Sequence, residues 1–145
     1  MNASMIEIIV PAVPVAEPRK RTRVVGNFAT HYTPTDSPVN AFKATVKLAT
    51  QMAIASRSSF TGPVAIDLLF AFPRTAGQVW AKKPMPRLMH TKKPDADNLA
   101  KSVLDALNGL LWIDDAQVCS LTVTKVICSG DERPFVRIRA NEYAL

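Results

Sequence analysis

The sequence predicts an α+β fold, a single domain in which two main helices pack on a mixed β-sheet in the order β-α-β-α-β-β. Two observations lead to this prediction. Apolar or β-branched runs of strand length alternate with segments that repeat apolar residues at helical spacing. The chain also has 145 residues, 48% of them hydrophobic, without an internal repeat or a domain boundary, so residues 1–145 should form one core.

The first part of the chain should provide one strand, a basic arm and one helix. Residues 5–10 are a β-branched run closed by a proline, which is typical of a strand. Residues 11–37 are rich in proline, contain PRKRTR and keep no hydrophobic period, so we expect a basic loop or arm. Ser37 and Pro38 are typical of a helix start, and we expect a helix over residues 38–56. Its buried face should hold Val39, Phe42, Val46 and Ala49.

The middle of the chain should provide a central strand and a long basic loop. Residues 63–72, PVAIDLLFAF, are mostly apolar, as in a strand that is covered on both faces. Residues 73–94 contain six Lys or Arg, four prolines and no acidic residue. A loop of this length inside a compact domain is usually functional or disordered.

The last part should provide the second helix and two strands. The helix should end before Gly109, which is placed as its left-handed cap. Strands should cover Val118–Ile127 and residues 135–140, with a turn at SGDERP. In the last strand Arg137 and Arg139 should share one face, opposite which either solvent or DNA could lie. The inward residues of the helix should be Leu99, Val103, Leu104 and Leu107.

Charge favours a polyanionic partner. The net charge is +6 and the pI is about 9.6, a balance that points to nucleic acid. No apolar run approaches the roughly 20 residues that span a bilayer, and no signal peptide heads the chain, so we expect a cytoplasmic protein without membrane association. The candidate DNA-binding residues are Arg19, Lys20, Arg21 and Arg23 in the arm and Lys82, Lys83, Arg87, Lys92 and Lys93 in the loop.

Four other side chains have less specific contexts. Cys119 and Cys128 are too few for a disulfide scaffold or a zinc site, and we expect both to be buried free thiols in a reducing cytosol. Trp112, within LLWI, is expected in the core rather than stacked on a base. His31 and His90 should be surface histidines in basic loops, with a phosphate contact as the alternative.

Asp95 and Asp97 flank the start of the second helix. One aspartate suffices to cap a helix, a role worth about 0.5–2 kcal/mol, whereas two aspartates beside Asn98 exceed that need. In an extended approach both side chains can point the same way. Mg²⁺ binds one or two carboxylates and keeps waters for substrate phosphate, so capping and metal binding are both open at this position.

Three further charged positions follow. Lys101 lies one helical turn beyond Asp97, in a row that Asp105 continues. It could form a surface ion pair worth a few tenths of a kcal/mol, or stabilise charge on a metal-bound phosphate. Asp114 and Asp115 could be a solvated turn or a third acidic position.

The segment KPDADNLAKSVLDALNGLLWIDDAQV, residues 93–118, resembles the signature of the RusA family of Holliday-junction resolvases. The family pattern is D-x-D-N-(x)₂-K, then D-A-L, an aromatic residue and D-D-x-Q-V, and every element is present. The resemblance implies a homodimeric, Mg²⁺-dependent endonuclease, with Mn²⁺ as a possible substitute, that cuts four-way DNA junctions symmetrically. It places the metal-binding aspartates at Asp95, Asp97 and Asp115 and the essential lysine at Lys101. It also implies a bacterial or phage-encoded enzyme of recombination and repair.

Three alternatives accompany this interpretation. The chain could be a non-catalytic branched-DNA-binding module whose acids are helix caps. It could be a metal nuclease that prefers flaps or forks, or a polyanion-binding scaffold with no preference for DNA. Metal-dependent cleavage and competition among DNA structures would distinguish them.

Overall fold

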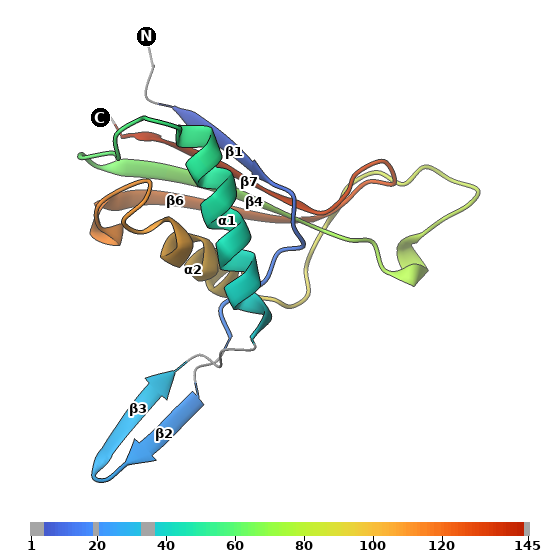
Figure 1. The fold of residues 1–145 in the computed structure, drawn as a ribbon. Helices are drawn as coiled ribbons and strands as arrows, with labels where there is room; N and C mark the ends of the chain where they lie inside the picture. Colours follow the sequence, from blue (N-terminus) through green and yellow to red (C-terminus); the bar gives the residue numbers. More distant parts are fainter. Residues whose placement is uncertain (1–4, 19–20, 33–36, 144–145) are drawn as a thin grey trace.

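The computed structural model describes residues 5–18, 21–32 and 37–143, and it confirms the predicted α+β class (Figure 1). A sheet of five strands carries two α-helices, and a separate two-stranded hairpin lies away from it. No helix among the described residues is long and apolar enough to cross a membrane. The elements are β1 (Ile6–Val10), β2 (Arg21–Val25), β3 (Phe28–Tyr32), α1 (Pro38–Ile54), β4 (Val64–Phe72), η1 (Ala76–Gln78), β5 (Leu88–Met89), α2 (Ala96–Leu107), η2 (Asp115–Gln117), β6 (Val118–Ile127) and β7 (Phe135–Glu142).

The main sheet is mixed, with the strand order β1-β7-β4-β6-β5. β4 and β6 run parallel, whereas the pairs β1–β7, β4–β7 and β5–β6 are antiparallel. A parallel pair needs a crossover connection, and the chain from β4 to β6 provides it through α2. β4 is the central strand, as predicted.

Both helices lie on the same face of the sheet, where they cover the apolar core (Figure 1). Val39, Phe42 and Val46 are buried on α1, and Leu99, Val103 and Leu107 on α2, in agreement with the predicted faces. Each such side chain contributes roughly 1.5–3 kcal/mol through removal of apolar surface from water. Trp112 is also fully buried, as predicted.

Two residues of the predicted faces are only half-buried. Ala49 packs at the edge of the core, and the fully buried neighbour is Thr50, whose hydroxyl donates to the Val46 carbonyl over 2.8 Å. Leu104 packs against the core and also lines a groove beside α2. The predicted cap is confirmed: α2 ends at Leu107, and Gly109 follows with φ +78°, a value that favours glycine.

The expectation of a loop over residues 11–37 was wrong for residues 21–32. Residues 21–32 form the antiparallel hairpin β2–β3, with Gly26 at φ +61° in its turn. Alternating β-branched residues around Gly26-Asn27 are a hairpin signal that outweighed the proline-rich surroundings. Residues just before the hairpin pack on α2: the Ser102 hydroxyl donates to the Val15 carbonyl over 2.8 Å, and the Glu17 amide donates to the Asn98 carbonyl over 2.9 Å.

Three smaller expectations also need correction. The helices cover only one face of the sheet, so β4 is fully buried on both faces only in its second half, where Leu69 and Ala71 join a small cluster with Cys128. The long loop contains the short elements η1 and β5. Cys128 is a buried free thiol as expected, but Cys119 is exposed, because nothing among the described residues covers the start of β6 on its side.

Candidate functional site

A groove of about 610 Å³ lies between α2 and β6 and gathers four charged residues of the signature segment. Asp97, Lys101 and Asp105 reach it from α2, and Asp115 reaches it from η2. Leu121 and Val123 line it from β6, where side chains two residues apart share one face. Asp97, Lys101 and Asp105 are exposed and Asp115 is half-buried, so the groove is open to solvent.

Asp95 and Asp97 differ in what their carboxylates do at the start of α2. Asp95 occupies the N-cap position, yet its exposed carboxylate makes no capping hydrogen bond. The Oδ1 atom of Asp97 accepts a hydrogen bond from the Asn98 amide over 2.9 Å, and this amide is one of the free N–H groups of the first turn. Asp97 therefore satisfies part of the helix end, whereas the Asp95 side chain does not. Asp97 lines the groove, whereas Asp95 precedes it in the chain and is not part of its lining.

The adjacent aspartates Asp114 and Asp115 have different surroundings. Asp114 caps η2, where its carboxylate accepts a hydrogen bond from the Ala116 amide over 2.9 Å. The Oδ1 atom of Asp115 instead accepts a hydrogen bond from the buried indole nitrogen of Trp112 over 2.6 Å. Only Asp115 of this pair lines the groove.

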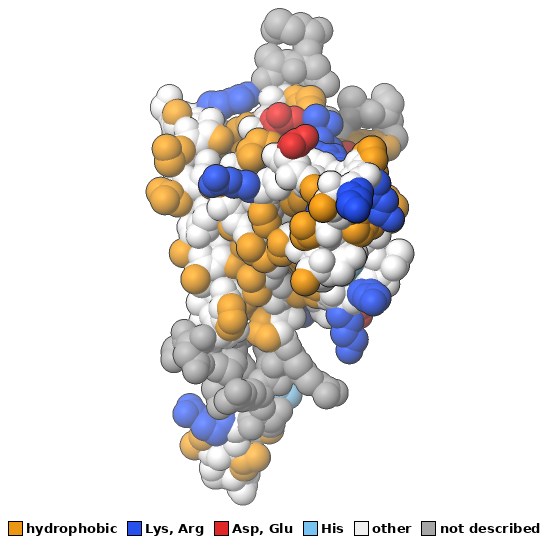
Figure 2. Space-filling model, turned by 90° about the vertical axis from the view of Figure 1, so that its right-hand side faces the viewer, with side chains coloured by type: hydrophobic (Ala, Val, Ile, Leu, Met, Phe, Trp, Pro, Cys, Tyr) orange, Lys and Arg blue, Asp and Glu red, His pale blue; other side chains and the backbone are white. Residues whose placement is uncertain are grey.

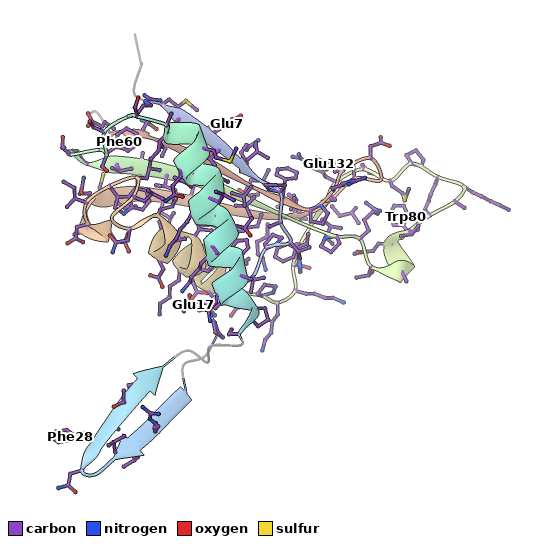
Figure 3. All side chains as sticks on the ribbon, viewed as in Figure 1. Glu7, Glu17, Phe28, Phe60, Trp80 and Glu132 are labelled. Atoms are coloured by element: carbon purple, nitrogen blue, oxygen red, sulfur yellow. The ribbon has the colours of Figure 1, made fainter. Side chains whose placement is uncertain are left out.

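Lys101 is exposed on the groove, and no ion pair joins it to a described carboxylate. Asp105, one turn along α2, pairs with Lys43 of α1 over 3.4 Å. Lys43 also lies 2.6 Å from the nearly buried carboxylate of Glu17, beside the end of α1 nearest the hairpin (Figure 3). Asp105 is thus engaged with Lys43, and no ion pair joins Lys101 to Asp97, the described carboxylate four residues before it. Lys101 lines the groove beside Asp97.

The donor chemistry of the groove fits a hard divalent cation, since carboxylate oxygens are the ligands that Mg²⁺ and Mn²⁺ prefer. Within residues 5–18, 21–32 and 37–143, no three His, Cys, Asp or Glu side chains form a preformed metal-binding group. Asp97 and Asp115 share the groove, which matches the one or two carboxylates that usually hold Mg²⁺ when substrate phosphate and water supply the other ligands. Asp95 stays a predicted ligand.

Two further residues hold side chains or main chain beside the groove, and these roles are not evident from the sequence. The sequence predicts Trp112 only as a core residue, but its indole N–H also donates a hydrogen bond to Asp115. The ammonium group of Lys125, on β6, donates hydrogen bonds to the Lys92 and Pro94 carbonyls just before α2. The Lys125 contacts require the fold to bring β6 beside the segment that precedes α2. The Trp112 contact spans only three residues and depends on the local path of the chain from Trp112 into η2.

The predicted DNA-binding residues divide into two groups in the 73–94 loop. Lys82, Lys83, Lys92 and Lys93 are exposed, and the Lys83 ammonium lies 4.1 Å from the centroid of the Trp80 ring. Arg87 instead makes a two-pronged ion pair with Glu132, with N–O distances down to 2.6 Å. Figure 3 shows Trp80 and Glu132 on two neighbouring loops that project together from the sheet. Arg87 therefore joins these loops and has less charge to offer DNA.

Arg21 and Arg23, two of the remaining basic candidates, lie on the hairpin, which also has an apolar tip. Arg19 and Lys20 lie outside the described residues, and Arg21 is described only as part of strand β2. Arg23 is exposed on β2, and Phe28, near the turn, is 78% exposed (Figure 3). Figure 2 shows Lys and Arg side chains spread over the body and hairpin, with few acidic side chains on that face.

His90 is less exposed than expected, whereas His31 is exposed as predicted. The His90 ring packs edge-on against Phe72 at 4.5 Å, and its Nδ1 accepts a hydrogen bond from the Lys92 amide over 3.2 Å. Burial, together with the nearby Lys125 and Lys92 ammonium groups, lowers the pKa of His90. A neutral ring stabilises this loop without adding charge.

Comparisons with known proteins agree with the resemblance in the signature segment. The family model for Endodeoxyribonuclease RusA matches residues 11–139. A relative, Uncharacterized protein YqaN of Bacillus subtilis (strain 168), is 38% identical over 87 aligned positions, and the match covers 57% of this chain. The match covers 59% of that relative's length. Because the family match includes both helices, the groove, strands β4, β5 and β6 and most of β7, the chain belongs to the RusA family of endodeoxyribonucleases.

Proposed function

We propose that this protein is a Mg²⁺-dependent endonuclease that resolves four-way DNA junctions by paired, symmetric cuts. It would act as a cytoplasmic homodimer in bacterial or phage recombination and repair. The observation that carries the proposal is the groove, where Asp97, Lys101 and Asp115 meet on a chain of the RusA family. Acidic residues would repel a phosphodiester unless a cation lay between them, which argues for a metal in an otherwise basic protein.

Each groove residue has a defined part in this proposal. Asp97 and Asp115 would hold the cation, with Asp95 as a further carboxylate at the start of α2. Bound Mg²⁺, or Mn²⁺ in its place, would polarise the scissile phosphate and lower the pKa of a bound water. Lys101 would stabilise the negative charge that develops on the phosphate in the transition state. Trp112 orients Asp115, because its indole N–H holds one carboxylate oxygen and leaves the other available.

Charge and symmetry support a junction as substrate. A dimer would carry a net charge of +12, twice the +6 of one chain, and neutralise phosphates on several arms. The exposed lysines of the 73–94 loop suit contacts with the phosphate backbone, which carry no sequence information. A two-fold dimer would present two equivalent sites, as paired cuts on opposing strands require.

The deciding experiment incubates the purified protein with a labelled mobile four-way junction in Mg²⁺ or EDTA. We expect paired nicks with Mg²⁺, none with EDTA, and none with Asp97→Asn in either condition. Binding without cleavage by the wild type would favour the non-catalytic module. Competition with flap, fork and linear DNA, and with heparin, tests the preferred substrate, and light scattering after size exclusion tests the dimer.

A further inference from the structure

Lys125 ties the segment that leads into α2 to the sheet. Its ammonium donates to the Lys92 carbonyl over 2.7 Å and to the Pro94 carbonyl over 2.6 Å. Hydrogen bonds from a charged donor are roughly twice as strong as neutral ones. The side chain is only half-exposed, so these bonds are partly shielded from water.

The tied segment has few other anchors to the sheet. β5 ends at Met89, and the next residue, His90, donates its amide hydrogen to the Lys125 carbonyl over 3.1 Å. The strand pairing with β6 does not continue beyond this point. Pro94 has no amide hydrogen to donate, so its carbonyl is its only main-chain hydrogen-bonding group. Asp95 follows immediately, and its carbonyl accepts the Leu99 amide in the first turn of α2. The place where α2 begins therefore depends on what holds the carbonyls before it.

Lys125 also lies on the same strand face as the wall of the groove. Leu121 and Val123 line the groove from β6, and Lys125 is the next residue in that alternating row. Its register partner on β4 is Phe70, which is fully buried under the helices, so this face of β6 is the helix side. β6 thus contributes both the apolar wall of the groove and Lys125, which holds the segment before α2 on the opposite, acidic side of the groove.

We propose that Lys125 is a positioning residue that sets Asp95 and Asp97 for metal binding by fixing the Lys92 and Pro94 carbonyls. This inference rests on the proposed function of these carboxylates. Lys125 touches neither of them, and it acts through the main chain between them and β6. Residues that orient metal ligands from outside typically change metal affinity or activity about 10- to 100-fold when they are removed.

The test compares Lys125→Met, which keeps the apolar stem and removes the donor, with Lys125→Arg, which retains a charged donor. Thr124→Val is the matched control, because Thr124 is the neighbouring half-buried residue of β6 on the opposite face. Three readouts apply to each variant: Mn²⁺ affinity by electron paramagnetic resonance, the Mg²⁺ concentration for half-maximal junction cleavage, and hydrogen exchange of residues 90–98. All are measured well below each variant's Tm.

We expect Lys125→Met to weaken Mn²⁺ binding and raise the Mg²⁺ requirement about 10-fold or more, with faster exchange over residues 90–98. Junction affinity in EDTA should stay within about twofold of wild type, and Lys125→Arg should recover part of the loss. Wild-type metal affinity and exchange in folded Lys125→Met would overturn the inference, and so would an equal loss in Thr124→Val. If the wild type cuts no branched DNA, the proposed function fails, whereas the exchange comparison still tests the tie.

Discussion

The indole nitrogen of Trp112 lies 2.6 Å from the Oδ1 atom of Asp115, which joins the centre of the core to the acidic groove. The indole is fully buried, so its position is set by packing against the surrounding core residues. A carboxylate held by such a donor keeps one orientation toward the groove. The same side chain therefore serves stability and the site.

This relationship predicts that Trp112→Phe separates the two roles. Phenylalanine keeps most of the buried apolar area but removes the N–H donor, so we expect a stability loss of about 1–3 kcal/mol. The Mg²⁺ requirement for cleavage should rise as well, because Asp115 loses its orientation. Trp80→Phe, outside the core, is the control. Denaturant unfolding and Mg²⁺ titration check both effects, and an unchanged Mg²⁺ requirement would contradict the second.

Asp97→Asn should abolish cleavage while junction binding persists or tightens, because one negative charge near the phosphates is removed. Asp95→Asn and Asp115→Asn should behave alike. Asp114→Asn is the matched control, since Asp114 caps η2 and asparagine is an equally good cap. Gel shift in EDTA and single-turnover cleavage in Mg²⁺ measure the two effects. An inactive Asp114→Asn beside an active Asp115→Asn would show that the pair was assigned in the wrong order.

Lys101→Ala should slow single-turnover cleavage by about 10²–10³ at saturating Mg²⁺, the effect of deleting one preorganised electrostatic donor. Its Tm and junction affinity should stay close to wild type, because no ion pair holds the Lys101 ammonium to a described carboxylate. Lys47→Ala, an exposed lysine on α1, is the control for loss of charge. Cleavage within about threefold of wild type would return Lys101 to the role of a surface residue.

Lys82 and Lys83 should contribute to DNA affinity in a way that Arg87 does not. Replacing both lysines by alanine should weaken binding equally for all junction sequences and reduce the salt slope by up to about two units. Arg87→Ala should lower the Tm and change the slope little, because Glu132 already neutralises Arg87. Binding isotherms across a salt series provide the measurement. A loss confined to one junction sequence would indicate base recognition instead.

The ion pair between Arg87 and Glu132 should make stability depend on acidity. The hydrogen bonds that the Glu132 carboxylate accepts from Arg87 lower the pKa of Glu132 from 4.5 to about 2. A lowered carboxyl pKa contributes stability above pH 4.5 that is lost as the pH falls toward 2. For a partly exposed pair this amounts to at most about 1 kcal/mol.

Thermal unfolding from neutral pH to acid tests this dependence. Wild type should unfold at a higher temperature than Glu132→Gln at neutral pH, and the difference should vanish near pH 2. Asp131→Asn, an exposed neighbour in the same turn, controls for the loss of one charge. A difference that is the same at both ends of the series would mean that the effect is not ionic.

Local patterns in the sequence were sufficient for most of the secondary structure. The strand expected near Val118–Ile127 was confirmed as β6, and the last strand, expected at residues 135–140, was confirmed as β7. Capping by Gly109 is equally local, since a left-handed residue is needed where α2 ends. These features depend on neighbours within a few residues, which is why a single sequence reveals them.

The hairpin was missed because of signals within a few residues. Other errors concerned side chains whose burial depends on whether a distant element covers them. Gly26-Asn27 signalled a turn, but the prolines on both sides outweighed it in the prediction. Cys119 and Leu104 are apolar side chains in regular elements, and sequence alone places them in the core. Whether another element covers them depends on the packing of the whole domain, and here none of the described elements does so completely.

The sequence by itself determined the fold class, the signature segment and the chemical types of the groove residues. Only the tertiary structure decided that Asp115 and not Asp114 faces the groove, that Asp105 pairs with Lys43 and that Glu132 neutralises Arg87. The first depends on where η2 lies beside α2 and β6, and each ion pair joins side chains from separate segments, α1 with α2 and the loop of Arg87 with the turn of Glu132. How separate elements pack is set by the whole domain, so no pattern confined to a few residues can specify these contacts.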